Sequence, residues 1–475
     1  MLPITLSSAT AWGLAGTHVL LASLVTIDVL LKKSDVRGAI GWIAASWFSP
    51  ILGSLIYYMF GINRVTRRAS RFETLRDAQV SPPGPSTLST LNENIALLSS
   101  SNARVTDSPL IAGNHLEIFQ GGDAAYPAML AAIEGAQSCV ALASYVFRND
   151  AAGQAFSDAL IAANRRGVVV RVLLDSVGIG YFFPLILYRL QTAGVQAARF
   201  LHTWLPWRMP FINMRNHRKL LIVDGAVAFM GGMNVGAENS QNLEARNYIE
   251  DIHFRCQGPV VRLIMDAFAR DWAFTTNEVL DQSHWWPTLG KSGSVFARGL
   301  RSGPDADIYK LEMVLGAALT LARKQVRIVT PYFLPDQRLQ FAIAQACQRG
   351  VKVDIVIPEH CNYIFMDWAM RGHLRFFNHI SANIYLTPLP FDHSKLATVD
   401  GEWSLVGSSN WDARSLRLNF EYNLECYNTE LAEALDMIID AKIARARQLS
   451  CQELAERPVL LRLRDAAARL FMPYL

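Results

Sequence analysis

Two stretches of the chain carry the same chemically capable residues at the same spacing. Each contains a histidine, a lysine two residues later, an aspartate, a glycine and an asparagine. The residues are His217, Lys219, Asp224, Gly231 and Asn234 in the first copy, and His393, Lys395, Asp400, Gly407 and Asn410 in the second. Since each residue type makes up a few per cent of an average protein, one such pattern arises by chance in about one chain in ten thousand. Two copies with identical spacing therefore indicate a duplicated functional site.

The spacing suits the binding of a phosphate. In an extended strand alternate side chains point the same way, so His217 and Lys219 share a face. The apolar run 220–223 continues this strand into a core, and Asp224-Gly225 favours a hairpin turn. The later glycine lets the backbone bring an asparagine alongside. An imidazole, an ammonium group and an amide on one surface supply a nucleophile or acid and two groups that hold phosphate oxygens.

Two facing sets would place two histidines around one phosphodiester. One imidazole would attack phosphorus and form a covalent phospho-enzyme, and the other would protonate the leaving alkoxide and then deprotonate the incoming alcohol. An ordinary pKa of about 6.5 suits histidine to both tasks near neutral pH. The non-bridging oxygens would be held by Lys219, Lys395, Asn234 and Asn410. This chemistry needs no metal, and the sequence shows no clear carboxylate cluster for one.

Each histidine should also have a carboxylate on its other ring nitrogen, which orients the imidazole. Asp251 and Glu421 stand at similar distances downstream of His217 and His393 and are the candidates. Weaker candidates, more typical of solvated charges, are Glu238, Glu244 and Glu250. The histidines interpreted as non-catalytic are His253, His360 and His379. Two tyrosines at equivalent strand ends fit either pocket lining or packing, and they are Tyr145 and Tyr332.

The paired motifs resemble those of the phospholipase D superfamily, and nearly the whole chain is similar to the bacterial cardiolipin synthases. This resemblance implies phosphatidyl transfer between two phosphatidylglycerol molecules through a phosphohistidine, giving cardiolipin and glycerol without a cofactor. It also implies that His217 is the nucleophile and His393 the acid/base, a choice that the pseudo-symmetric motifs do not make. The segments 249–253 and 418–421 match the family where it places the carboxylate partners. Asp224 and Asp400 belong to the catalytic motif set, but the resemblance implies that they have a structural role and are not direct catalysts.

Two other functions fit part of the pattern. A membrane-anchored phospholipase D hydrolase or a nuclease would use the same two-histidine site with water as acceptor. A nuclease would want a basic groove with exposed aromatic side chains, and no dense Lys/Arg run borders either motif, so nucleic acid is not an expected partner. A non-catalytic lipid-binding scaffold that kept the fold is the third reading, and the two intact motifs argue against it.

Composition points to membrane contact. Hydrophobic residues make up 51% of the 475 residues and the mean hydropathy is +0.16, while the net charge of +4 suits an anionic surface. The six cysteines form no Cys-x-x-Cys pair, which favours buried thiols in a reducing compartment over a zinc site.

The first 76 residues are expected to anchor the chain. Apolar stretches at 11–31 and 39–60 are each near the twenty residues that a membrane-spanning helix needs. Three basic residues lie between them and five arginines follow, which favours a multi-pass hairpin with both ends and the catalytic domain in the cytoplasm. The resemblance to the bacterial synthases implies that this membrane is the inner (plasma) membrane. A shallow interfacial insertion is the alternative. Asp28, one helical turn before Lys32, could pair with it.

The rest of the chain is expected to fold as two similar halves. Strand–helix–strand patterns recur at 139–147, 155–164 and 167–175, and again at 326–330, 338–348 and 350–358. They predict a duplicated α/β fold with two mixed, mainly parallel sheets flanked by helices. The expected domains are an anchor (1–76), a linker with a short helix at 91–98 (77–108), a first half (109–290) and a second half (291–475). Trp204, Trp207 and Phe211 could cover the core or face lipid, and the tail 458–475 could be a membrane-surface helix or dock on the core.

Overall fold

The computed structural model describes residues 8–33, 36–61, 91–203, 214–243, 247–304 and 307–471. The chain divides into two compact units. Unit 1 contains Met1–Arg67 and His202–Asn213, and unit 2 contains Arg68–Leu201 and Met214–Leu475. The loop residues Trp204, Trp207 and Phe211 lie outside the described residues.

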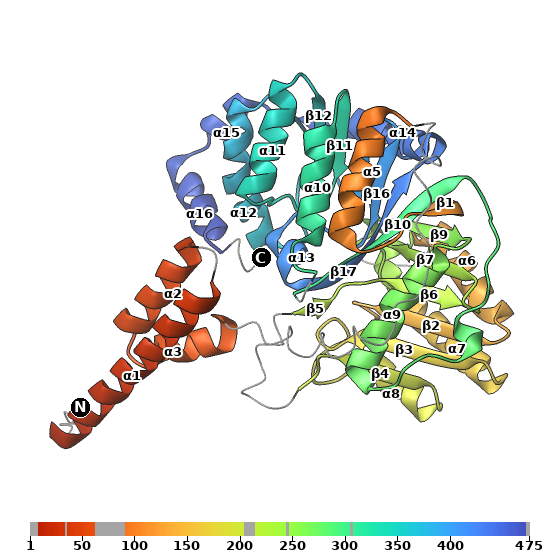
Figure 1. Cartoon of the computed structure of the whole chain (residues 1–475), viewed down its shortest axis with the longest axis horizontal. Helices are drawn as coiled ribbons and strands as arrows, with labels where there is room; N and C mark the ends of the chain where they lie inside the picture. Colours follow the sequence, from red (N-terminus) through yellow and green to blue (C-terminus); the bar gives the residue numbers. More distant parts are fainter. Residues whose placement is uncertain are drawn as a thin grey trace. The chain divides into compact units, whose positions relative to one another are not determined.

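Of the described helices, only the first is long and apolar enough to cross a bilayer. It is α1 (Ser8–Lys32), in which Thr10–Lys32 has 23 residues and a mean hydropathy of 1.9. The second apolar stretch, expected to be one spanning helix, is divided into α2 (Val36–Phe48), α3 (Leu52–Ile56) and a π-helical turn, η1 (Tyr57–Gly61) (Figure 1). At 1.5 Å per residue α2 is about 20 Å long, short of the ~30 Å hydrocarbon core.

Pro50 accounts for this division. It has no N–H with which to continue α2, and it disfavours helical backbone in the residue before it. Within residues 8–61, α1 and η1 are joined by a hydrogen bond from the Tyr57 hydroxyl to Asp28 Oδ2 (2.7 Å). Asp28 also pairs with Lys32, as the sequence predicts. The second apolar stretch is therefore not one continuous helix, and a 13-residue α2 is more typical of an interfacial or re-entrant segment.

Unit 2 is built on one sheet of 16 strands (Figure 1). The strands of the first half are β1 (Ile111–Gln120), β2 (Cys139–Ser144), β3 (Val169–Asp175), β4 (Gln196–Phe200), β5 (Arg215–Asn216), β6 (Leu220–Val223), β7 (Val227–Gly231), β8 (Ile249–Glu250) and β9 (Ile252–Gln257). Those of the second half are β10 (Val295–Ser302), β11 (Gln325–Val329), β12 (Lys352–Pro358), β13 (Asn383–Thr387), β14 (Phe391–Asp392), β15 (Leu396–Val399), β16 (Trp403–Gly407), β17 (Asn419–Tyr427) and β18 (Arg447–Gln448).

The strand order shows two copies of one arrangement placed edge to edge. It runs β18-β13-β12-β11-β15-β16-β17-β10-β1-β9-β7-β6-β2-β3-β4, with β10 and β1 antiparallel at the junction. The duplicated α/β fold is confirmed, but the two halves share one sheet instead of forming two. Most neighbouring strands are antiparallel, because the Asp-Gly turns after β6 and β15 return the chain as the hairpins β6-β7 and β15-β16. Parallel pairing within the main sheet occurs in β2-β3-β4, in β11-β12-β13, and between β17 and the short strand β5, which lies off this order.

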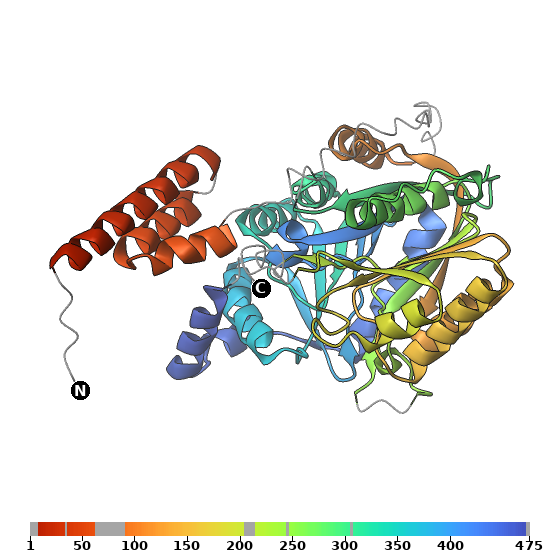
Figure 2. The ribbon, with the colours of Figure 1, turned by 90° about the horizontal axis from the view of Figure 1, so that it is seen from below.

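Helices cover both faces of this sheet (Figure 2). The first half contributes α6 (Gly122–Gly135), α7 (Ala151–Arg165), α8 (Leu185–Thr192) and α9 (Val261–Thr276). The second half contributes α10 (Lys310–Leu321), α11 (Gln337–Gln348), α12 (Ile364–Leu374), α13 (Ala413–Arg417), α14 (Thr429–Arg445), α15 (Cys451–Ala455) and α16 (Val459–Arg469). Alternate residues of β2, Val140 and Leu142, enter one core cluster with Phe156 of α7 and Leu187 of α8, as a strand buried on both faces requires.

Part of the expected linker belongs to unit 2. The short helix expected at 91–98 extends over α5 (Glu93–Thr106), which packs on α10. Asn94 donates to Asp400 Oδ2 (2.8 Å), and Asn102 donates to Glu425 Oε1 (2.5 Å). Because these buried contacts are polar, the segment has the composition of a linker while it folds as part of the unit.

Candidate functional site

Each motif histidine is held by the opposite half of unit 2. The two-residue strand β5, which leads into His217, pairs with the start of β17, and β14, which leads into His393, pairs with β8. The His217 N–H donates to Phe420 O (2.9 Å), and the His393 N–H donates to Glu250 O (2.7 Å). The residue that follows each of these acceptors, Glu421 or Asp251, is a candidate orienting carboxylate, so the exchange of strands brings histidines and carboxylates together.

The carboxylates are therefore crossed between the halves. His217 Nδ1 lies 3.0 Å from Glu421 Oε2, and His393 Nδ1 lies 2.7 Å from Asp251 Oδ2. The spacing in the sequence associates Asp251 with His217 and Glu421 with His393, whereas the structure gives each histidine the carboxylate of the other half. The site thus needs both halves for each imidazole.

The two carboxylates are supported differently. Glu421 is fully buried and accepts hydrogen bonds from Ser408 Oγ (2.5 Å), Ser415 Oγ (2.9 Å) and Asn419 Nδ2 (3.2 Å). Asp251 Oδ1 accepts the Ile252 N–H (2.7 Å). Where the second copy has Ser408 the first has Gly232, and a Cβ there would collide with the Asp251 carboxylate. The Gly-to-Ser difference between the copies is the sequence signal for this asymmetry.

Burial and neighbouring charges set the protonation states. Burial, followed by the charge of Lys395, lowers the pKa of His393 to about 4, against the opposing effect of Asp251. Burial also lowers the pKa of His217, partly offset by Glu421. Both carboxylates have a pKa below the usual value, although burial by itself raises it. At Asp251 the charge of Lys395 and the charge and hydrogen bond of His393 outweigh burial, and at Glu421 the charge and hydrogen bond of His217 do so. Neutral imidazoles that donate Nδ1–H to carboxylates keep the Nε2 lone pair for chemistry.

The motif lysines lie beside the histidines but not along a regular strand as expected. Residues 217–219 fall between β5 and β6, and Lys219 Nζ folds back to donate to His217 O (2.7 Å). Lys395 Nζ likewise donates to His393 O and lies 3.0 Å from its Nδ1. Burial lowers the pKa of Lys219 well below its ordinary value, although the Glu421 charge opposes this. The side-chain nitrogens of both lysines therefore lie beside the two histidines.

The asparagines and tyrosines complete the surroundings. Asn234 Oδ1 accepts the Val146 N–H (3.1 Å), which fixes the orientation of its amide. Asn410 is buried, and its Oδ1 has no hydrogen-bond partner among the described residues. The Tyr145 ring lies 5.1 Å from the His217 ring, and the Tyr332 ring lies 6.3 Å from the His393 ring. Each tyrosine thus accompanies one histidine.

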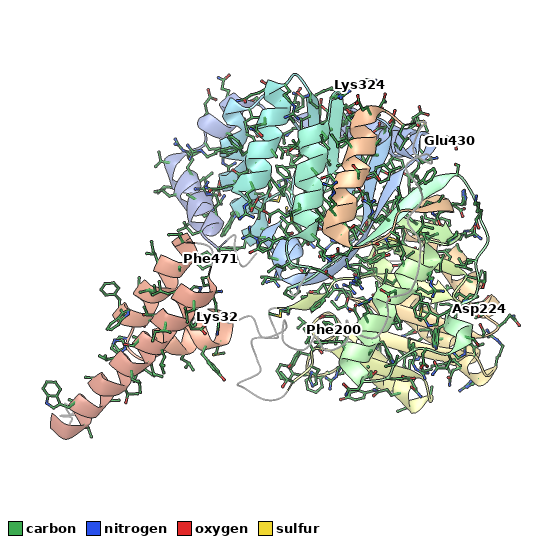
Figure 3. The ribbon with its side chains drawn as sticks, in the orientation of Figure 1. Lys32, Phe200, Asp224, Lys324, Glu430 and Phe471 are labelled. Atoms are coloured by element: carbon green, nitrogen blue, oxygen red, sulfur yellow. The ribbon has the colours of Figure 1, made fainter. Side chains whose placement is uncertain are left out.

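The motif aspartates are not part of this cluster. Asp224 accepts the N–H groups of residues 137–139, and Asp400 accepts those of residues 323–325. Each is separated from the motif lysine by a four-residue strand, which is about 13 Å long. In Figure 3, Asp224 and Lys324 lie at the outer parts of the two halves, away from Phe200, whose ring packs 5.0 Å from that of Phe420, next to Glu421. The position of these aspartates does not agree with a direct catalytic role. It agrees with the structural role that the resemblance implies.

The weaker candidates are placed as follows. Glu238 pairs with Arg148 and Glu250 pairs with Arg445, while Glu244 lies outside the described residues. His253 is buried, and neither of its ring nitrogens has a hydrogen-bond partner among the described residues. Ser408 and Asn419, which donate to Glu421, are among the groups that the sequence analysis did not single out. No group of three or more metal-ligating side chains occurs in the described part of the chain.

Comparison with known proteins agrees with the two-copy site. A family described as "Cardiolipin synthase, PLD-like domain" matches residues 129–272 and 315–443, and one described as "Phospholipase_D-nuclease N-terminal" matches residues 20–61. The major cardiolipin synthase ClsA of Bacillus subtilis is 29% identical over 96% of this chain and 97% of its own length. A cardiolipin synthase of Oceanobacillus iheyensis is 30% identical over 97% of this chain and 98% of its own length. A phosphatidylserine synthase structure from Haemophilus influenzae has the same fold, with a TM-score of 0.64 and 16% identity over 81% of this chain and 100% of that one.

Proposed function

The chain belongs to the cardiolipin synthase family with phospholipase D-like domains, and we propose that it transfers a phosphatidyl group from one phosphatidylglycerol to another. The products are cardiolipin and glycerol. The observation that supports this best is the crossed pair of imidazole–carboxylate contacts, His217 with Glu421 and His393 with Asp251. It provides one nucleophile and one acid/base around a single phosphodiester, in a domain of the family whose members make cardiolipin.

In the first step His217 Nε2 attacks the phosphorus of the donor lipid. The N–P bond forms as the bond from phosphorus to the glycerol oxygen breaks, and His393, protonated at Nε2, gives its proton to that oxygen. His393 takes up this proton from solvent when the substrate binds, because an anionic phosphodiester between the rings raises the low pKa of His393. Glu421 stabilises the positive charge that develops on the phosphorylated His217 ring.

In the second step the phosphatidyl group moves to the acceptor. His393 removes the proton of a hydroxyl on the second phosphatidylglycerol, that oxygen forms a bond to phosphorus, and the N–P bond to His217 breaks. Lys219, Lys395 and the two motif asparagines hold the non-bridging oxygens in both steps. The cycle consumes no proton overall and needs no metal ion.

The membrane setting supports a lipid acceptor. The family match at residues 20–61 and the apolar helix α1 associate the chain with a membrane. We place it in the inner (plasma) membrane with unit 2 on the cytoplasmic side, because arginines dominate the flank of unit 1 that leads into unit 2. Substrates and product would then remain in one bilayer.

Product analysis tests this function. The purified full chain is reconstituted in vesicles of phosphatidylglycerol labelled in its terminal glycerol, with a chelator and no added divalent ion. Cardiolipin and free glycerol should form in a one-to-one ratio, and His217→Ala should form neither. Phosphatidic acid without cardiolipin would instead identify a hydrolase, and cleavage of DNA or RNA without lipid turnover would identify a nuclease.

A further inference from the structure

Unit 2 has an apolar surface that begins next to a catalytic histidine. The His393 ring lies 6.3 Å from that of Tyr332, which lies 6.5 Å from that of Tyr363. Tyr363 starts α12, and it is 64% exposed. The next residue, Ile364, is 67% exposed. Aromatic contacts therefore lead from the site to the surface at the start of α12.

The C-terminal helix continues this surface. α16 packs along α12, and the Phe471 ring lies 5.6 Å from that of Phe365. The tail therefore docks on unit 2, as one of the two expectations had it, but much of its apolar surface stays uncovered. We name as the α12–α16 surface the exposed residues Tyr363, Ile364, Phe365, Val459, Leu460, Leu463, Leu470 and Phe471. A contiguous apolar surface of this kind is typical of an interaction site.

The exposed charges of α16 have one sign. The basic residues of α16 are Arg462, Arg464 and Arg469. Its one acidic residue, Asp465, is buried and pairs with Arg457 and Arg464. The exposed charge of the helix is therefore positive, and Arg464 also lies over the Trp368 ring of α12, 4.4 Å from its centroid. An amphipathic helix with exposed leucines and arginines is typical of a segment that lies on an anionic membrane.

The first half has a related feature at the equivalent place. The segment after β3, which corresponds to the one after β12, exposes Phe183 (81%), Leu185 and Tyr188. β2 and β11, the strands next to β3 and β12, are followed within three residues by Tyr145 and Tyr332, the tyrosines beside the two histidines. Exposed apolar side chains thus follow the strands that border the site in both halves.

From these contacts we propose that the α12–α16 surface docks unit 2 on the bilayer and delivers lipid to the site. The leucines and aromatic rings enter the interface, and the arginines of α16 contact anionic head groups. A lipid head group then reaches His393 along Tyr363 and Tyr332 without crossing water. The proposal rests on the proposed function for its lipid substrate, but the docking itself does not depend on turnover.

Lipid contact is measured first, with the full chain in vesicles that contain anionic lipids brominated in their acyl chains. A fluorescent label is attached at Leu460→Cys, Leu463→Cys or, as the matched control, Met437→Cys. Met437 of α14 is 67% exposed, comparable to 80% for Leu460 and 62% for Leu463, but it lies outside the α12–α16 surface. Labels at 460 and 463 should be quenched by the brominated lipids, and a label at 437 should not.

Activity is measured second. Leu460→Ser together with Leu463→Ser should lower cardiolipin synthesis from bilayer phosphatidylglycerol by roughly tenfold or more, since two apolar side chains leave the interface. Synthesis from a short-chain phosphatidylglycerol below its micelle concentration should stay within about twofold of wild type. The control Met437→Ser should change neither rate.

Several results would contradict the proposal that this surface docks on the bilayer. Absence of quenching at 460 and 463, or equal quenching at 437, would show that lipid does not contact it specifically. Shielding of these labels that follows protein concentration, without lipid quenching, would assign the surface to a second copy of the chain. Equal loss with bilayer and dissolved substrate would assign the leucines to folding. Quenching at 460 and 463 in a wild-type chain that makes no cardiolipin would contradict the proposed function and leave the docking standing.

Discussion

Replacing Glu421 by glutamine removes the charge that supports His217 while keeping the size of the side chain. Glu421 is fully buried, and one of its oxygens lies 3.0 Å from His217 Nδ1. Two unit charges about 4 Å apart interact by about 4 kcal/mol at an effective dielectric constant near 20. If most of this interaction is felt only as the ring becomes phosphorylated and positive, the first step slows by about a hundredfold to a thousandfold. Asp251→Asn should impose a comparable loss on the steps that use His393.

The first and second chemical steps can be measured separately with a substrate analogue, a lipid phosphodiester that carries a nitrophenol leaving group. Nitrophenolate leaves without a general acid, so the first turnover requires His217 but not His393. A rapid burst of nitrophenolate should therefore disappear in Glu421→Gln and in His217→Ala. The burst should persist in Asp251→Asn and in His393→Ala, followed by slow release of product because the acceptor is not deprotonated.

The test is whether each carboxylate variant has the same phenotype as one of the histidine variants. Crossed carboxylates predict that Glu421→Gln behaves like His217→Ala and that Asp251→Asn behaves like His393→Ala. If Glu421→Gln instead shares the phenotype of His393→Ala, each carboxylate serves the histidine of its own half and the crossed geometry is wrong. If the pairs hold but the burst is lost in the His393 pair, the geometry stands and the nucleophile is His393.

Three further predictions follow from other contacts. Asp224→Asn should lower the stability of unit 2 by about 1–3 kcal/mol, measured as a lower melting temperature, because it weakens a carboxylate that accepts three backbone N–H groups, while the burst per folded molecule stays unchanged. Burial lowers the pKa of His253 from 6.5 to about 4, so between pH 6.5 and 4 the unfolded chain binds more protons than the folded chain. The free energy of unfolding should therefore fall as the pH drops from 6.5 to 4, by roughly 3 kcal/mol for this group. His253→Gln should reduce that fall, and an unchanged pH profile of the melting temperature would contradict this prediction. Exhaustive chelation should leave cardiolipin synthesis intact in vesicles of fixed composition, and a loss that a single divalent ion restores would point to a metal-dependent mechanism.

Much of the site could be predicted from the sequence because its signal is local. The spacing of His217 and Lys219 before an apolar run and an Asp-Gly turn predicts a strand followed by a hairpin, and the structure has β6-β7 there. The repetition of that spacing predicts the duplicated fold. Asp251 and Glu421 could be chosen because each follows its motif at a similar distance.

The crossing of the two halves could not be predicted in the same way. It depends on β5 and β14, strands of two residues each, whose partners lie far away in the sequence. So short a strand has no periodicity to read, and its pairing is decided by tertiary packing. The separation of Asp224 from the histidines follows from the length of β6 and could have been anticipated from the rise of a strand.

The membrane and linker segments show two other limits. Hydropathy averaged over residues 39–60 passes over Pro50, although proline is a strong signal for the end of a helix. The helix α5 was expected to be shorter because its buried face includes Asn94 and Asn102, which look like linker residues until their partners Asp400 and Glu425 are known.

The stereochemistry at phosphorus tests the central claim of a covalent phosphohistidine most directly. The chain is given phosphatidylglycerol with a chiral phosphorothioate of known configuration, and the configuration of the transferred phosphorus in the cardiolipin product is determined. Attack by His217 followed by attack of the acceptor comprises two in-line displacements, so the account predicts overall retention. Inversion would show a single displacement by the acceptor and would contradict it.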